Sequence, residues 1–454
     1  MLAKLRYAKQ MQLDQAVRLR WVYLVLSALT LLFLGFLYGW SILAVPLQSA
    51  FGWTAGDLAI TFTLSTAMFC VGGVIGAQIT KRTAPRLTLW LSALLIVAGY
   101  FASAQADAQG IQLIYIAYGI CVGGASGMAH NAILGCTNNW FPDRIGTSSG
   151  ALTLGFGLGS LVIGPLVGAA IDSLGWQTSY ILLGAATALV VTAGSIVIRY
   201  PSPSQTLPPP AAPRVKATEK PTGPSATRAV KSPSDRTVKP RTTPSGLDFS
   251  TKEMLRCAPF YLTFIVAVLF AAIYLATMGN AKLIALELGA AATVATVMVG
   301  MVSLGDGFSR LASGLFFDRF GYRVSLVVVA VCFTASALTL FSAYSFGQLG
   351  LVVAGFILLG LGFGSISTVL AAITNRFYGP KNYGSNLSVA YLDFVPASLI
   401  GPPLLGLMQT TTGSFQPAFA ILAVFGVVAL IIALFIFPPQ HKPNINKSPD
   451  EGPL

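Results

Sequence analysis

The chain has 454 residues, of which 54% are hydrophobic and only 9% are charged. Soluble domains carry about 25% charged residues, so this composition excludes an ordinary soluble enzyme. It also excludes disorder for most of the chain, because disorder needs low hydrophobicity and high charge. The net charge of +13 does not indicate nucleic-acid binding, since the chain has no zinc-ligand cluster and no basic amphipathic domain. The composition is typical of a polytopic membrane protein.

Twelve apolar segments are each long enough to cross a bilayer, which takes about 20 residues of α-helix. Their uninterrupted apolar runs indicate helices rather than the short alternating strands of a membrane barrel. We therefore predict an all-α membrane protein. The predicted spans are residues 21–45, 57–80, 88–106, 111–138, 148–171, 177–199, 258–281, 293–317, 324–344, 349–374, 384–409 and 415–437.

The positions of Lys and Arg predict the orientation of these spans. If the N-terminus is cytoplasmic, all but two of the 28 Lys and Arg residues lie in or beside cytoplasmic segments. This is a strong positive-inside pattern, so we expect both termini on the cytoplasmic side of a cell membrane, in a bacterium the inner one. The two exceptions are Lys282 and Arg310.

A hydrophilic segment divides the spans into six and six. Residues 201–250 are rich in Pro, Ser, Thr and Lys and cannot form a core, so we predict a disordered linker. It either binds anionic lipid headgroups or is a solvated tether. The predicted organisation is a basic cytoplasmic arm (1–20), a six-helix bundle (21–199), the linker region (200–257), a second six-helix bundle (258–437) and a cytoplasmic tail (438–454).

The two halves resemble each other in sequence. IGPLVGAAID, which begins at Ile163, matches IGPPLLGLMQ, which begins at Ile400. ITKRTAPR matches FFDRFGYR at the same offset, with Arg82 aligned to Arg319. A parallel six-helix repeat with a long central loop is a transporter signature. We therefore predict two pseudo-symmetric bundles of six transmembrane helices each.

One repeated loop carries a family motif. The pattern G-x-x-x-D-R-x-G-x-R between helices 8 and 9 resembles the major facilitator superfamily, and its first copy, between helices 2 and 3, departs from it at Lys81 and Ala84. The resemblance implies the major facilitator fold and a cytoplasmic gate latch in these loops and in the loop after helix 4. The predicted latch residues are Arg82, Arg86, Asp143, Arg144, Asp318, Arg319 and Arg323.

Within that superfamily the chain resembles the oxalate/formate antiporter group and the monocarboxylate transporters. The resemblance rests on Tyr38-x-Trp40 in helix 1, Asp306-x-x-x-Arg310 in helix 8 and three further segments, Asn139–Arg144, Asn382–Asn386 and Ile400–Pro402. It implies that an arginine of helix 8 holds the carboxylate of the substrate.

Four ionisable residues lie inside predicted spans: His130, Asp306, Arg310 and Asp393. A charge at the centre of a span costs about 2.5–3.5 kcal/mol on insertion scales, so such residues are functional candidates. A rise of about 1.5 Å per residue places all four near the membrane midplane, where transporter substrates bind between the repeats.

Arg310 is the strongest candidate for a substrate contact. Its planar fork of donors fits a carboxylate bidentately and stays charged. The repeat places Gly73 at the equivalent position of the first half, so the fold does not need an arginine there. The alternative is a purely structural ion pair with Asp306, which lies one turn away on the same helix face.

Asp306 and Asp393 are the candidates for proton coupling. Protonation of Asp306 would free Arg310 for the substrate, and the resemblance to the monocarboxylate transporters implies the same role; a fixed salt bridge is the alternative. Asp393 lies beside Phe394, close to where the oxalate transporter has a second cation, a lysine. Because this chain has no lysine there, we expect a monoanion rather than a dianion as substrate.

Polar and aromatic residues of four helices complete the predicted substrate site. His130 could bond the carboxylate or titrate near neutral pH, or else form an ordinary interhelical hydrogen bond. The aromatic residues either enclose a small substrate or merely pack. These candidates are His130, Asn131, Tyr38, Trp40, Phe363 and Phe394.

The predicted function is secondary active transport of a small carboxylate by alternating access, with lactate, pyruvate, acetate or formate favoured and a proton or a counter-anion as the coupled species. The rivals are an oxalate/formate-type antiporter, a drug or sugar exporter, and an anion sensor that does not transport. We expect a functional monomer that contacts membrane lipid, with no cofactor, metal or nucleic acid. An enzyme is not expected, because no nucleophile–base set or metal motif is present.

Overall fold

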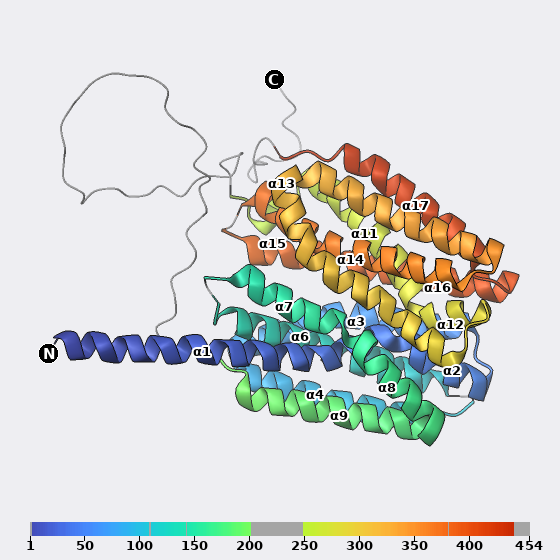
Figure 1. The fold of residues 1–454 in the computed structure, drawn as a ribbon, viewed down its shortest axis with the longest axis horizontal. Coiled ribbons are helices and arrows are strands. Elements are labelled where there is room, and N and C mark those ends of the chain that lie inside the picture. Colours follow the sequence, from blue (N-terminus) through green and yellow to red (C-terminus); the bar gives the residue numbers. More distant parts are fainter. Residues whose placement is uncertain (1, 109, 142, 201–247, 380, 440–454) are drawn as a thin grey trace, which may run out of the picture.

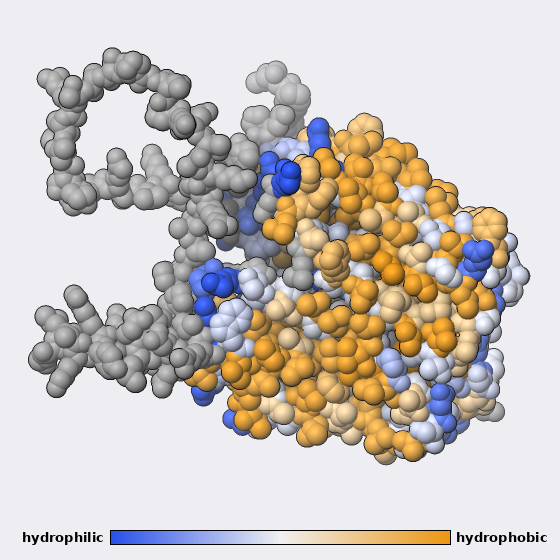
Figure 2. Space-filling view, viewed as in Figure 1, coloured by the Kyte–Doolittle hydropathy of each residue, from blue (hydrophilic) through white to orange (hydrophobic). Residues whose placement is uncertain are grey.

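The structure is a computed structural model that describes residues 2–108, 110–141, 143–200, 248–379 and 381–439, with the backbone alone at 2–18, 145, 146, 311 and 318. Every regular element in these ranges is a helix. Twelve helical segments are long and apolar enough to cross a membrane, which confirms the predicted all-α fold. Figure 2 shows apolar side chains over the outer face of these helices, with hydrophilic residues gathered at the two ends.

Six spans form the N-terminal half, the blue-to-green layer in Figure 1. Three of them consist of more than one helical element. The elements are α1 (Leu2–Gly35), η1 (Phe36–Gly39) and α2 (Trp40–Phe51); α3 (Ala55–Arg82); α4 (Pro85–Ser103); α5 (Ile111–Ile114), the π-helical η2 (Tyr115–Val122) and α6 (Gly123–Asn138); α7 (Ile145–Gly157) and α8 (Gly159–Leu174); and α9 (Trp176–Val197).

The C-terminal half is the yellow-to-red layer that lies beside it in Figure 1. Spans 8 and 9 are separated by a sharp turn at Gly321, where φ is 80°, and the label α13 covers the helices on both sides of this turn. The elements are α10 (Thr251–Met254), α11 (Ala258–Gly279), α12 (Ala281–Glu287), α13 (Ala292–Phe346), α14 (Leu349–Tyr378), α15 (Tyr383–Ala390), η3 (Tyr391–Asp393), α16 (Phe394–Thr412) and α17 (Gln416–Leu434).

Four spans interrupt their α-helix in mid-course, and in the fourth span the interruption is the π-helical η2. The first tightens into the 3-10 turn η1 between Gly35 and Trp40, and the fifth breaks at Leu158 between two glycines. The eleventh forms the 3-10 turn η3 just before Pro396, whose missing N–H leaves the carbonyl of Leu392 without its helical donor. Such breaks are tolerated in a membrane where neighbouring helices surround the exposed backbone.

Small residues let the helices approach closely. Between α3 and α6, a Cβ added at Gly72 would meet the backbone of Gly124, and one added at Gly127 would meet the backbone of Phe69. Because apolar surface alone does not drive helices together in lipid, close backbone packing of this kind stabilises the bundle.

The halves are joined from the middle of the bundle towards the end opposite the linker. Thr63 Oγ1 of α3 donates to the carbonyl oxygen of Ser398 at 2.9 Å. That carbonyl lacks its helical donor because residue 402 is proline. Further along, a Cβ added at Gly406 would lie 2.6 Å from the Cα of Gly56. The α3–α16 seam is therefore closed over this part of its length.

Lys282, one of the two cations that the charge pattern left unexplained, lies in α12 with 6% of its surface exposed. Burial lowers the pKa of its amine, while the charge of Asp172 in the other half acts in the opposite sense. This cation therefore adds an electrostatic attraction between the halves at the end opposite the linker.

The structure differs from the predicted boundary of the linker. Most of the segment, residues 201–247, lies outside the described residues, as does most of the predicted tail. Residues 248–257, at the end of the predicted linker region, are described and contact the C-terminal half. Asn382 and Asn386 both donate to the carbonyl oxygen of Phe249, at 3.0 and 3.2 Å, and Ser250 caps α10. Paired amide donors at the entry to span 11 therefore fasten this segment to the C-terminal half.

Candidate functional site

A chain of aromatic rings crosses from one half to the other at the level of the helix breaks. The ring of Tyr38 lies 5.5 Å from Phe156, 5.6 Å from Tyr274 and 6.2 Å from Phe363, measured between centroids. Phe363 stacks on Tyr274 at 3.6 Å and lies 5.7 Å from Phe394. We call these five rings the aromatic bridge. Three predicted site residues, Tyr38, Phe363 and Phe394, are thus brought together.

Arg310 and Asp306 form a charge pair beside this bridge. Arg310 Nε donates to Asp306 Oδ1 at 2.7 Å, and Nη2 donates to Oδ2 at 3.2 Å. The Asp306 side chain is 1% exposed and that of Arg310 is 12% exposed. The guanidinium carbon of Arg310 lies 5.7 Å from the centroid of Phe363, within cation–π range. The opposite charges of the two side chains cancel in this largely buried setting. A substrate carboxylate can bind the guanidinium in the same two-pronged geometry as Asp306.

Two glycines make room for the carboxylate of Asp306. A Cβ added at Gly157 of α7 would lie 2.7 Å from Asp306 Oδ2. One added at Gly364 of α14 would lie 2.7 Å from Oδ1. Gly157 belongs to the N-terminal half, so the charge pair lies directly at the boundary between the halves.

Gly157→Ala is expected to lower transport by about ten- to a hundredfold, because a methyl group at this position displaces the Asp306 carboxylate from its partner. The measurement is initial uptake in proteoliposomes at equal protein content. Gly150→Ala is the matched control, since it lies on the same helix and its Cβ would have nothing within 4 Å. Equal activity of the two variants would show that the site does not depend on this close approach.

His130 lies on the N-terminal side of the aromatic bridge. Its ring is 4.8 Å from Phe156 and 5.3 Å from Phe69. The charge of Arg310 acts on it electrostatically. Asn131 instead lies against α3, where a Cβ at Gly73 would collide with its side-chain nitrogen. The position equivalent to Arg310 is therefore filled by an amide from α6.

Asp393 lies in the break of span 11, next to Phe394. It is 3% exposed, and its Oδ1 has no hydrogen-bond partner among the described residues. Its charge acts electrostatically on Tyr38 and on Cys70 of α3. Asp393 thus faces the N-terminal half across the α3–α16 seam, whereas Arg310 and Asp306 face it across the seam between α13 and α7.

Trp40 lies away from this group. It is fully buried inside the N-terminal half, where its indole Nε1 donates to the carbonyl oxygen of Leu58 at 3.1 Å and its ring packs on Tyr118 at 4.5 Å. These contacts account for the residue as part of the core. Trp40 is therefore not part of the proposed site.

Five of the seven predicted latch residues have their described contacts within their own half. Arg20 of α1 donates to both oxygens of Asp143, at 2.6 and 3.3 Å, and Arg144 Nε lies 3.7 Å from the same carboxylate. The guanidinium of Arg86 lies over the ring of Trp90, and that of Arg319 over the ring of Phe320. Arg323 donates to the hydroxyl of Tyr322 at 3.2 Å. Arg82 is exposed at the end of α3, and Asp318 is described by its backbone alone.

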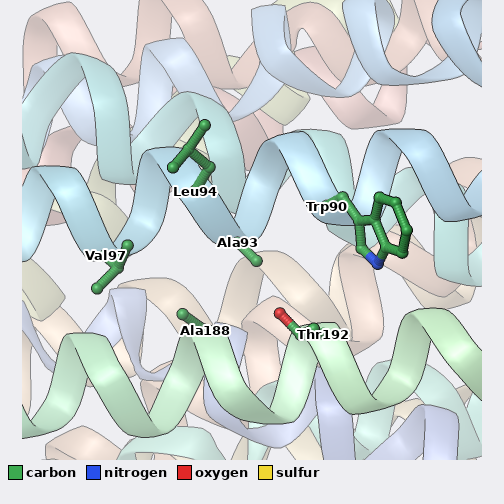
Figure 3. Close-up of a pocket in the computed structure, with 6 residues that line it drawn as sticks. All are labelled: Trp90, Ala93, Leu94, Val97, Ala188 and Thr192. Atoms are coloured by element: carbon green, nitrogen blue, oxygen red, sulfur yellow. The ribbon is translucent and has the colours of Figure 1, made fainter.

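A groove of about 300 Å³ lies between α4 and α9, on the surface of the N-terminal half, where Leu94 is 64% exposed. Figure 3 shows that its lining is almost wholly apolar. Without a charged group it does not offer a carboxylate site. The lining residues are Trp90, Ala93, Leu94, Val97, Ala188 and Thr192. In the described part of the chain no group of three or more His, Cys, Asp or Glu side chains is placed to hold a metal ion.

Some residues of the site were not predicted from the sequence. Phe156 and Tyr274 are central to the aromatic bridge, and Gly157 and Gly364 enclose the Asp306 carboxylate. An aromatic residue or a glycine within an apolar span is too common to single out. The informative signal in the sequence was the internal repeat. It aligns Asp306 with Phe69 and Arg310 with Gly73, so the two halves carry different chemistry at the same depth in the bundle.

Comparison with known proteins gives relatives across the whole chain. The chain is similar to the oxalate:formate antiporter of Oxalobacter formigenes, with 24% identity over 95% of this chain and 96% of that protein. It is also similar to monocarboxylate transporter 11 of Mus musculus (22% identity, 84% and 79% covered) and to the hexuronate transporter of Bacillus subtilis (23% identity, 89% and 91% covered).

Solved structures share the fold. A nucleoside transporter matches with a TM-score of 0.67 over 92% of this chain and all of the other, at 13% identity, and a peptide transporter matches with a TM-score of 0.65 at 14% identity. Identities this low establish the architecture and not the substrate. The family model of the Major Facilitator Superfamily matches residues 24–283 and 262–453. The chain therefore belongs to the Major Facilitator Superfamily and is a secondary transporter, not an enzyme.

Proposed function

We propose that this transporter moves a small monocarboxylate, such as lactate, pyruvate, acetate or formate, by proton-coupled alternating access. The observation that carries the proposal is the largely buried Arg310, which lies at the boundary between the halves and pairs there with Asp306. An arginine in this setting binds a carboxylate through two parallel hydrogen bonds. The similarity to an oxalate:formate antiporter and to a monocarboxylate transporter supports a carboxylate substrate.

In the proposed cycle, a proton neutralises Asp306 and releases the guanidinium of Arg310. The substrate carboxylate then takes the place of Asp306 at Arg310, and His130 or Tyr38 bonds its far side. Phe363 and Phe394 exclude water from the occupied site. The loaded site carries no net charge from these groups, so the halves can rock about it without exposing an unpaired charge to the apolar interior. Asp393 is a second candidate for carrying the coupled proton.

The number of cations at the site favours a monoanion. Among the described residues, Arg310 is the Lys or Arg whose charged group contacts the aromatic bridge. A dianion such as oxalate needs a second compensating charge, for which His130 is the candidate among the described residues near the aromatic bridge. An oxalate/formate-type exchanger is the second candidate function, and the extent of the similarity to that antiporter is the observation that favours it.

The orientation proposed from the charge pattern places both termini, the linker and the latch loops in the cytoplasm. The latch residues of the two halves would then meet when the site faces outward. We propose that the protein works as a monomer in a cell membrane, where lipid contacts its apolar outer face.

The test is uptake of labelled lactate, acetate, formate and oxalate by proteoliposomes, with and without an inwardly directed proton gradient. We expect the monoanions to enter and the gradient to accelerate them. If oxalate enters and internal formate accelerates it while the gradient has no effect, the exchanger is correct. If none of the acids enters, a carboxylate substrate is wrong.

A further inference from the structure

Asp393 has one carboxylate oxygen that the chain itself does not satisfy. The residue is 3% exposed, and its Oδ1 has no hydrogen-bond partner among the described residues. A buried ionised oxygen without a donor is strongly unfavourable, and such groups in folded proteins are usually paired. In the folded protein this oxygen is therefore satisfied by a proton, a water molecule or a donor group of a bound solute.

The position of Asp393 places this oxygen at the boundary between the halves. Asp393 ends the 3-10 turn η3, five residues before Ser398, whose carbonyl oxygen accepts the hydrogen bond of Thr63 from α3. Cys70 lies seven residues further along the antiparallel α3 and experiences the charge of Asp393. The carboxylate consequently faces the other half at the level of the substrate site.

Tyr38 is within electrostatic reach of Arg310, Asp306 and Asp393. The charges of Arg310 and Asp393 both act on it, and they do so from different helices of the C-terminal half. The Asp306–Arg310 pair faces Gly157 across the α7–α13 seam, while Asp393 faces Cys70 across the α3–α16 seam. The site thus has a carboxylate-binding pole at Arg310 and an acceptor pole at Asp393, and Tyr38 of the aromatic bridge interacts electrostatically with both.

We propose that Asp393 is a second substrate contact and accepts a hydrogen bond from a donor group, a hydroxyl or an ammonium, that the substrate carries in addition to its carboxylate. The inference rests on the proposed function, because Arg310 places the carboxylate end. It makes hydroxy- or amino-substituted monocarboxylic acids the preferred substrates. An unsubstituted acid of equal length leaves Oδ1 without a partner and is transported less well.

The first experiment compares acids that differ by one donor group. Uptake of lactate, β-alanine and propionate is measured for the wild type, Asp393→Asn and Asp393→Leu, as the ratio of each substituted acid to propionate. We expect the wild type to prefer a substituted acid by about ten- to a hundredfold, because a site built around a hydrogen bond rejects an analogue that lacks the donor. Asp393→Leu is expected to bring the ratios close to one.

Asp393→Asn separates the two donors. The amide oxygen still accepts from a hydroxyl but no longer attracts an ammonium, so a preference for lactate survives in this variant and a preference for β-alanine is lost. If the wild type shows no preference, or if Asp393→Leu keeps the wild-type ratios and changes only the response to a proton gradient, the inference is overturned and Asp393 acts in coupling alone. Arg310→Ala tests the proposed function separately, because it is expected to lower the uptake of all three acids alike.

A binding measurement covers the case of variants that do not fold. In otherwise wild-type protein with Cys121, Cys136, Cys257 and Cys332 replaced by serine, Cys70 is the remaining thiol. It is half-buried and lies across the seam from Asp393, so an occupied acceptor pole shields it from maleimide. We expect a substituted acid to slow the labelling at concentrations about tenfold lower than propionate needs. Equal protection by all three acids would contradict the proposal.

Discussion

Replacing Arg310 with alanine is expected to lower carboxylate uptake by at least about a hundredfold. The change removes both donors of the fork and leaves the Asp306 carboxylate buried without its partner. The substrate loses two charge-assisted hydrogen bonds, each worth about 1.5–3 kcal/mol, and each 1.4 kcal/mol corresponds to a factor of ten. The measurement is initial uptake of labelled lactate or acetate in proteoliposomes, together with binding by calorimetry.

Two variants make this result interpretable. Arg310→Lys keeps the charge but loses the bidentate geometry, so we expect intermediate uptake with weaker apparent affinity. Lys252→Ala removes an exposed cation of the same half, on α10, and is expected to leave uptake unchanged. Normal uptake by Arg310→Ala would rule out Arg310 as the carboxylate contact and would favour an exporter of uncharged solutes on the same fold.

Asp306→Asn is expected to abolish net uptake while leaving exchange between internal and external substrate largely intact. The amide keeps the shape of the carboxyl group but has no charge, so Arg310 stays available to the substrate without a proton. A loaded site can then reorient. An empty site would have to carry a bare, buried guanidinium between the two states, which is strongly unfavourable.

The readout compares two experiments on the same proteoliposomes. Net uptake is measured into substrate-free vesicles under a proton gradient, and exchange is measured into vesicles loaded with unlabelled substrate. Loss of both activities with the protein still folded would mean that Asp306 is needed for structure rather than for coupling. Net uptake that remains sensitive to pH would assign the coupled proton to another group, with Asp393 the first to examine.

The fold was largely predictable, because hydropathy and the Lys and Arg pattern depend on local composition. The twelve spans agree with the structure to within a few residues at most ends. The pairing of Asp306 with Arg310 was also predictable, since residues four apart on a helix lie on one face. Both inferences need only the periodicity of an α-helix and the thickness of a membrane.

The helix breaks limited what could be predicted about the site. Tyr38 and Trp40 are two residues apart, and both were aromatic candidates from the sequence, with Tyr38 favoured. The 3-10 turn η1 directs Tyr38 to the boundary between the halves and Trp40 into the core of its own half. The 3.6-residue period of an α-helix does not hold through such a turn. The direction in which side chains after the turn point is therefore set by three-dimensional packing and could not be predicted from the sequence.

The latch residues illustrate a different limit. Asp143 pairs with Arg20 rather than with the other half, and the contacts that join the halves lie from mid-bundle to the end opposite the linker. Contacts that alternate during a transport cycle depend on the state of the molecule. A sequence motif can identify the residues, but a single state shows only one of their arrangements.

The Asp306–Arg310 pair has a consequence for the driving force. The electric field across a membrane acts on net charge and changes the energy of one elementary charge by about 2.3 kcal/mol per 100 mV. Both members of the pair lie on α13, one turn apart, so they move together and their charges cancel. In the proposed cycle a monoanion accompanied by a proton adds no charge to them. Membrane voltage would then neither drive nor oppose this carrier, and its direction would follow the gradients of substrate and proton alone.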